Sequence, residues 1–165
     1  MKKYTFHGLL IDMKKCNINA KFKKNPNAKP NYFTGTVIAK DISTVIKPKE
    51  EKIYHVSFQN GARTKIHYHD AGQVLIVTKG IGSLILYKKL SNGKKKFKIS
   101  IQQSISLKKD DLVYIPKNIL HTHGAINKKR EFSHIAINSY PQRNIEPKTI
   151  WYESDFKKNV TDRLK

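Results

Sequence analysis

Short runs of alternating apolar and polar residues, separated by turn residues, constrain the fold of this chain most. A period of two is typical of strands with one buried face, and helical periodicity is almost absent. Turn dipeptides such as Asn60-Gly61 and Asn92-Gly93 end two of the runs. Strands are expected at 34–38, 53–58, 64–69, 73–78, 83–90, 96–101, 104–107, 112–115, 121–126 and 132–138. The pattern predicts an all-β barrel or sandwich in a chain long enough for one domain.

The two ends of the chain lack this alternation. Residues 1–32 are expected to be an irregular or extended segment, and residues 33–150 the barrel. Residues 151–165 form a tail in which Trp151, Phe156 and Val160 have loose helical spacing, so a short C-terminal helix is expected.

The composition and the N-terminal residues indicate the cell compartment in which the protein is expected. Cys16 is the single cysteine, which excludes an internal disulfide and a cysteine-rich zinc site. The N-terminal apolar stretch is broken by His7 and Gly8 and stops at Asp12, so no signal peptide is expected. No apolar run approaches the length of a membrane span. We therefore expect a cytoplasmic protein without membrane association.

The charge is strongly positive: 33 Lys and Arg oppose 12 Asp and Glu, a net charge of +21. The lysines occur along the whole chain, and arginine, the better bidentate reader of phosphate, is rare. We interpret most lysines as solvated surface residues. Weak, salt-sensitive adsorption to polyanions is expected, but no specific nucleic-acid partner.

Histidines provide the strongest functional signal. His67 and His69 are two residues apart on one predicted strand, as are His121 and His123 on another, so each pair points to one face. Two such strands facing each other in a small barrel bring three or four imidazoles together. Imidazole is a ligand for Mn, Fe, Ni, Cu or Zn. The amide oxygen of Gln73, just beyond a turn after His69, can reach back as a neutral ligand.

Two longer motifs contain these histidines. The stretch from Gly61 to Gly80 resembles the first cupin motif, G-x5-H-x-H-x3-E-x6-G, with Gln73 in the place of glutamate. The stretch from Asp110 to His121 resembles the second motif, G-x5-P-x-G-x2-H. Asp110 and Asn118 replace its glycines, and both residue types tolerate a left-handed backbone.

This resemblance to small single-domain cupins implies a single β-barrel of the jelly-roll type. Those with glutamine in the first motif include manganese-dependent hydroxynitrile lyases. The resemblance implies that His67, His69, Gln73 and His121 are metal ligands, with Mn²⁺ as the first candidate and Fe²⁺, Ni²⁺ or Zn²⁺ as alternatives. It also implies that His123 and His134 line a substrate cavity as acid–base groups. Strand parity places His123 on the same face as His121. It does not decide whether His134 faces the interior or the exterior of the barrel.

The function expected from these residues is metal-dependent lyase or decarboxylase chemistry on a small molecule. The metal is expected to act as a Lewis acid and a histidine to move the proton. Two alternatives are an oxygen-activating cupin dioxygenase and a non-catalytic protein that binds a metal or a ligand. Exposed edge strands in small barrels lead us to expect a homodimer or homotetramer.

Overall fold

The computed structural model describes residues 3–6, 9–22, 28–129 and 131–165, and the side chains within these ranges from residue 13 onward. Twelve strands and two short helical segments occur in this part of the chain. Their bounds are β1 Lys3–Phe6, β2 Leu9–Asp12, η1 Pro30–Tyr32, β3 Val37–Asp41, α1 Ser43–Ile46, β4 Glu51–Phe58, β5 Ile66–His69, β6 Gln73–Lys89, β7 Phe97–Lys108, β8 Leu112–Ile115, β9 Leu120–Ala125, β10 Phe132–Ser139, β11 Thr149–Ser154 and β12 Asn159–Arg163. The prediction of an all-β jelly roll is confirmed.

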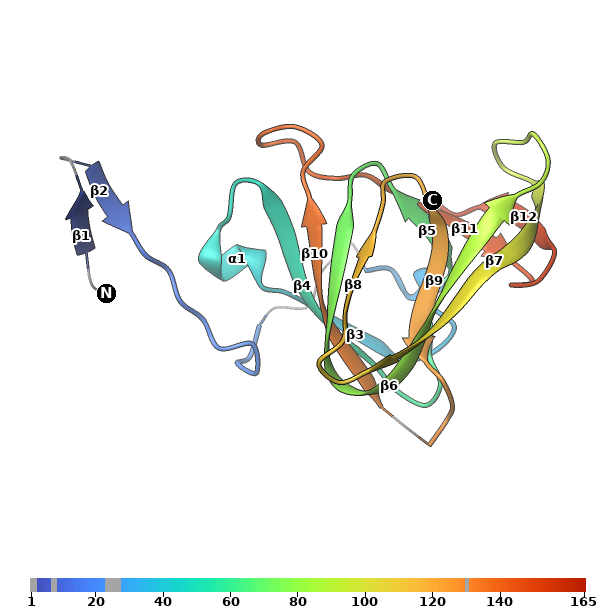
Figure 1. The fold of residues 1–165 in the computed structure, drawn as a ribbon, viewed down its shortest axis with the longest axis horizontal. Coiled ribbons are helices and arrows are strands. Elements are labelled where there is room, and N and C mark those ends of the chain that lie inside the picture. The colour runs from blue at the N-terminus through green and yellow to red at the C-terminus, as the bar shows by residue number, and fades with distance from the viewer. Residues whose placement is uncertain (1–2, 7–8, 23–27, 130) are drawn as a thin grey trace.

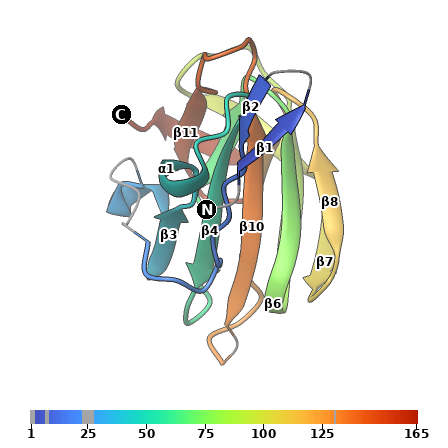
Figure 2. The ribbon, with the colours of Figure 1, turned by 90° about the vertical axis from the view of Figure 1, so that its left-hand side faces the viewer.

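Two antiparallel sheets share the long strand β6. Its first half pairs with β10 and β8, and β10 continues to β4 and β3. Figure 2 shows β3, β4, β10 and β6 side by side. The second half of β6 pairs with β7 and β9, and β9 leads through β5 and β11 to β12, which pairs with β7. The second sheet therefore closes on itself.

Two predicted strand breaks are absent. The strands predicted at 73–78 and 83–90 are one strand, β6, which runs through Lys79-Gly80, and β7 likewise joins the two strands predicted at 96–101 and 104–107. Gly80 has a φ of +75°, and the ladder between β6 and β10 shifts register nearby, at Ser133/His134. A glycine in this conformation bends the strand from one sheet into the other without ending it.

The expected C-terminal helix is wrong, because residues 149–154 and 159–163 are the strands β11 and β12. β11 pairs with β5, and Tyr152 is buried against Phe97 at a ring distance of 5.1 Å. A short isolated helix is marginal in water, whereas the edge of β5 supplies backbone partners and an apolar surface.

The N-terminal region is not wholly irregular. β1 and β2 form a two-stranded ladder that Figure 1 shows apart from the barrel. No helix in the described part of the chain is long and apolar enough to span a membrane.

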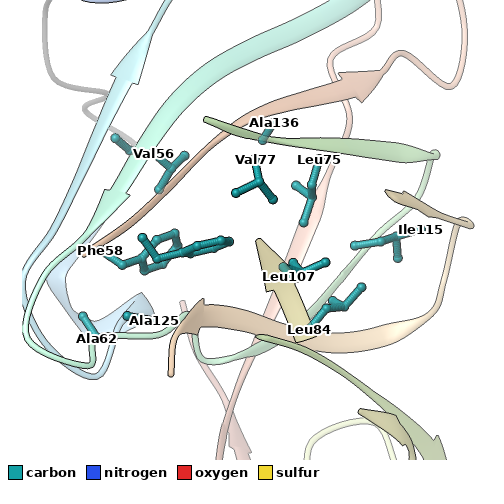
Figure 3. Packing of buried hydrophobic residues seen from close by; sticks show 12 residues of the cluster. Val56, Phe58, Ala62, Leu75, Val77, Leu84, Leu107, Ile115, Ala125 and Ala136 are labelled. Atoms are coloured by element: carbon teal, nitrogen blue, oxygen red, sulfur yellow. The ribbon is translucent and has the colours of Figure 1, made fainter. Parts of the chain in front are cut away.

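The main hydrophobic core lies between the two sheets, as Figure 3 shows. Val56 and Phe58 of β4 and Leu75 of β6 come from the first sheet, and Leu84 and Leu107 come from the second. Phe58 and Leu75 are completely buried. These apolar side chains do not fill the whole interior of the barrel. The histidines lie in the part that remains.

Candidate metal centre

Strands β5 and β9 bring three histidines together. His67 and His69 alternate onto the inner face of β5, and His67 is the direct cross-strand partner of His121 in β9. One ring nitrogen from each of the three lies within 4.8 Å of the others. The ring centroids of His67 and His121 are 4.1 Å apart, and all three residues are buried. The predicted convergence of imidazoles is therefore present.

Hydrogen bonds orient the three rings. Nδ1 of His67 donates to the carbonyl oxygen of Lys65 at 2.9 Å, and Nδ1 of His121 donates to that of Ile119 at 2.8 Å. Nδ1 of His69 lies 2.9 Å from the hydroxyl of Thr149. The two backbone contacts leave Nε2 of His67 and of His121 with the lone pair, the arrangement that second-shell hydrogen bonds give to metal-binding histidines.

Burial keeps these rings neutral. Burial and the neighbouring imidazole of His121 lower the pKa of His69 to about 3, and burial lowers the pKa of His121 to about 4. The pKa of His67 is well below its usual value for the same reasons. Neutral imidazole is the form that binds a metal ion. The buried Nε2 of His121 has no hydrogen-bond partner among the described residues, so this donor set fits a cation.

Gln73, the first residue of β6, lies beside this cluster. Its Nε2 is 3.0 Å from Nε2 of His69 and donates to Oδ1 of Asn138 at 2.7 Å. Its Oε1 is buried and unpartnered within the described chain. A half-turn of the carboxamide exchanges the two atoms and presents the oxygen to the cluster. The structure thus places Gln73 next to the three histidines, while its role as a ligand stays a prediction.

Asn138 is a contact that sequence reasoning missed. It follows His134 and Ala136 on the inner face of β10, so the two-residue period was the signal that could have revealed it.

His123 and His134 form a second imidazole group. Nε2 of His134 lies 3.1 Å from Nδ1 of His123, and both rings are buried. The structure settles the face of His134, which points inward. Burial lowers the pKa of His134 to about 3 and that of His123 well below its usual range. His123 also lies 5.5 Å from His67, between ring centroids, so this pair borders the three-histidine cluster.

Trp151, which the sequence analysis assigns to a helical tail, contacts a candidate ligand. Its ring stacks on His67 at a centroid distance of 4.2 Å, and Tyr32 stacks on its other side at 4.6 Å. Trp151 is the cross-strand partner of His67 in the ladder between β11 and β5. The predicted helix concealed this pairing.

A cavity of about 260 Å³ joins these groups. The walls contain all the sequence-predicted site residues except His121, which lies behind them. They are formed by Ala28, Phe33, Ala39, Lys52, Tyr54, Val56, Thr64, His67, His69, Gln73, His123, His134, Ala136, Asn138, Glu146, Pro147, Thr149 and Trp151. The arrangement can hold one small molecule against the histidines.

Comparison with solved structures supports the fold assignment. A cupin-like protein from Thermotoga maritima is 34% identical, with a TM-score of 0.53, over 73% of this chain and 81% of its own. A sugar phosphate isomerase from Silicibacter pomeroyi is 15% identical, with a TM-score of 0.53, over 72% of this chain and 66% of its own.

A variant of oxalate decarboxylase from Bacillus subtilis is 15% identical, with a TM-score of 0.51. The likeness covers 70% of this chain but 27% of the decarboxylase. No curated protein matches the sequence.

The sequence also matches the cupin family over residues 50–161, which contain both histidine motifs and nine of the twelve strands in whole or in part. With its two-sheet barrel and the histidine cluster inside it, this chain belongs to the cupin family.

Proposed function

We propose that this protein is a metal-dependent enzyme that carries out proton-transfer chemistry, of the lyase or decarboxylase type, on a small oxygenated molecule. One observation carries the proposal: a cluster of three neutral histidines lies against a cavity that two of them, His67 and His69, line together with a hydrogen-bonded imidazole pair. His67, His69, His121 and Gln73 would hold the ion. A divalent ion at this position supplies a Lewis acid for a substrate oxygen.

The donor set favours a first-row transition metal. It contains imidazole nitrogens and an amide oxygen, which suit Mn²⁺, Fe²⁺, Ni²⁺ or Zn²⁺, and none of the four is charged. We propose Mn²⁺, since one structural neighbour, a Bacillus subtilis oxalate decarboxylase, has Mn(II) centres. The uncompensated charge favours a substrate with a developing negative oxygen.

His123 and His134 are proposed to move the proton. Because burial keeps both rings neutral at pH 7, either one can accept a proton. Their mutual hydrogen bond uses Nδ1 of His123 and Nε2 of His134, which leaves Nε2 of His123 for the substrate. His134 then stabilises the protonated His123 through the shared bond. Phe58 packs at 5.7 Å from His123 and 5.5 Å from His134, between centroids, and holds both rings in place.

The walls of the cavity limit the substrate. A volume of about 260 Å³ lies just below the usual range of ligand pockets, so the substrate is small. Trp151 and Phe33 form an aromatic part of the wall. A substrate that fills the cavity would displace water from the histidines, which strengthens the electrostatic interactions with the substrate oxygen.

The experiment combines metal content with turnover. Protein loaded with Mn²⁺ is assayed on cyanohydrins, 2-hydroxy acids and 2-keto acids, beside the His123→Gln and His134→Gln variants. We expect wild-type turnover and, in His123→Gln, unchanged metal content with a loss of about 10²–10⁴ in kcat. Substrate-dependent oxygen uptake would instead indicate a dioxygenase. Metal-loaded protein without any turnover would support a binding protein.

A further inference from the structure

A second polar cavity lies on the opposite face of the β3–β4–β10–β6 sheet. Along β4, Tyr54 and Val56 point toward the metal centre, so His55 and Ser57 point outward. The N-terminal residues Ile18 and Asn19 lie over part of this outer face and line, together with it, a cavity of about 380 Å³ that is open to solvent on one side. The lining consists of Ile18, Asn19, Ile38, Lys40, His55, Ser57, Phe58, Gln59, Thr78, Lys79, Glu131 and Ser133.

Buried polar side chains make this outer face unusual. His55 is only 9% exposed and Ser133 6%, although outward-facing residues of a sheet normally contact water. Nε2 of His55 lies 3.4 Å from the Thr78 hydroxyl, and Ser133 donates to Ser57 at 3.0 Å.

The other nitrogen of His55 is incompletely paired. Nδ1 is buried and forms no hydrogen bond of standard geometry with a described residue, and a backbone contact with Ile18 raises the pKa of the ring against the effects of burial and Lys40. When Nε2 accepts from Thr78, Nδ1 carries the proton and becomes a donor into the cavity. Such a buried donor is costly unless a water molecule or a ligand accepts from it.

The charge of the lining is positive. Lys40 is paired in register with His55, and burial together with the charge of Lys40 lowers the pKa of that ring. Lys40 forms no ion pair with another described residue. Glu131 is neutralised by Lys79 at 2.5 Å. One uncompensated ammonium therefore lines the same space as an imidazole N–H and the hydroxyl of Ser57, which accepts from Ser133 and keeps its own proton. Donors of this kind recognise the oxygens of an anion.

We propose that this outer cavity is a binding site for a phosphate-like oxyanion, either free phosphate or the phosphoryl group of a small metabolite. Lys40, His55 and Ser57 supply the donors. The site is separate from the metal centre, because the β4 strand lies between them, and it does not depend on the proposed enzyme activity.

The test is calorimetric titration of the full-length protein with inorganic phosphate at constant ionic strength. We expect one saturable site per chain. Lys40→Met and Ser57→Ala should each weaken it by about tenfold, since a charge-assisted hydrogen bond is lost in one and a hydroxyl donor in the other. Both substitutions affect partly exposed residues, and thermal melting verifies that each variant is folded. Glycerol phosphate, titrated in parallel, distinguishes a phosphomonoester from free phosphate by the tighter binding.

Two control variants distinguish this site from general attraction to the positive surface and from phosphate bound at the metal. Lys98→Met removes one exposed charge from β7, outside the cavity, and should leave the affinity unchanged. In His67→Ala phosphate should still bind, whereas phosphate held at the metal centre would be lost with the metal. The proposal is overturned if no saturable binding occurs up to millimolar phosphate, or if Lys98→Met weakens binding as much as Lys40→Met.

Discussion

Hydrogen bonds at single residues decide the chemistry of the candidate metal centre. Backbone carbonyl groups accept from Nδ1 of His67 and His121, so the position of each proton follows from contacts within two residues of the ring. Burial then keeps the rings neutral. A free histidine has neither property, because water satisfies both of its nitrogens and its pKa is near 6.5.

Metal content should separate a necessary ligand from an auxiliary one. We expect His67→Ala to lose bound metal and Gln73→Ala to bind about 10–100-fold more weakly, since an amide contributes less than an imidazole. Elemental analysis measures this loss. Fluorescence of Trp151, the only tryptophan, follows metal binding in wild type and Gln73→Ala, because its ring stacks on His67.

Gln103→Ala, on the exposed part of β7, is the control and should retain the metal. If Gln73→Ala instead kept its full metal content and affinity, Gln73 would not be a ligand. Its role would then be limited to the hydrogen bond with Asn138.

The stability of the metal-free protein should depend on pH through its buried histidines. His134 has a pKa of about 3 in the folded protein and near 6.5 when unfolded. Between these values only the unfolded chain binds the proton, so the free energy of unfolding decreases as the pH falls below 6.5. Each such histidine contributes about 1.4 kcal/mol per pH unit.

Urea unfolding of wild type and His134→Gln at several pH values measures this slope. The variant should have a slope smaller by about 1.4 kcal/mol per pH unit near pH 5. Equal slopes for the two proteins would show that His134 is charged in the folded state.

At the scale of elements, backbone conformation positions the strands that carry the site. Asp110 and Asn118 have φ values of 76° and 64°, so these replacements of glycine adopt the left-handed backbone that the sequence predicted. Asp111 also accepts from the Lys108 amide at 2.8 Å, a hydrogen bond typical of aspartate in turns. These turns connect β7 to β8 and β8 to β9, which carries His121 and His123.

Close packing of β9 should make Gly124 sensitive to substitution. A Cβ atom there would lie 2.5 Å from the carbonyl oxygen of Ala62 and from Cα of Arg63, which are backbone atoms. We expect Gly124→Ala to lower the free energy of unfolding by about 1–3 kcal/mol, as overpacking does.

Chemical denaturation tests this, with Gly72→Ala as the matched control. The Cβ of that variant would meet only the Tyr114 ring, at 2.8 Å, and this ring is 61% exposed and can move aside. A Gly124→Ala variant as stable as Gly72→Ala would show that β9 can shift away from the Ala62 loop.

The whole molecule carries a net charge of +21, and only a few of its lysines are paired within the described residues. Lys52 and Lys65 form ion pairs of 2.8 and 2.6 Å with Glu146 and Glu153. The remaining excess is spread over the surface, which favours non-specific attraction to polyanions. The expected homodimer or homotetramer stays a prediction.

Binding to nucleic acid should therefore depend on salt and not on sequence. We expect the affinity for random duplex DNA to fall by orders of magnitude between about 50 and 200 mM salt, because the binding arises from counterion release. Fluorescence anisotropy with two unrelated duplexes measures it. Persistent binding to one of them at the higher salt concentration would reveal a specific site.

Local patterns in the sequence determined the fold class and most of the candidate site. Period-two alternation predicted strands, and His-x-His spacing predicted which rings share a face, because both depend only on the geometry of an extended backbone. The histidines of β5 and β9 thus converge as expected. The role of Gln73 as a ligand and the roles of His123 and His134 stay predictions.

Only the tertiary structure decided the features that depend on partners distant in sequence. β11 is a strand because β5 pairs with it, and the same pairing places Trp151 on His67. His134 points inward because β10 packs between β4 and β6. The outer cavity exists because residues 18 and 19 lie over β4. Such contacts join segments that are far apart in the chain and that only the folded barrel brings together. The energies of these contacts are therefore not encoded in any local spacing of residues.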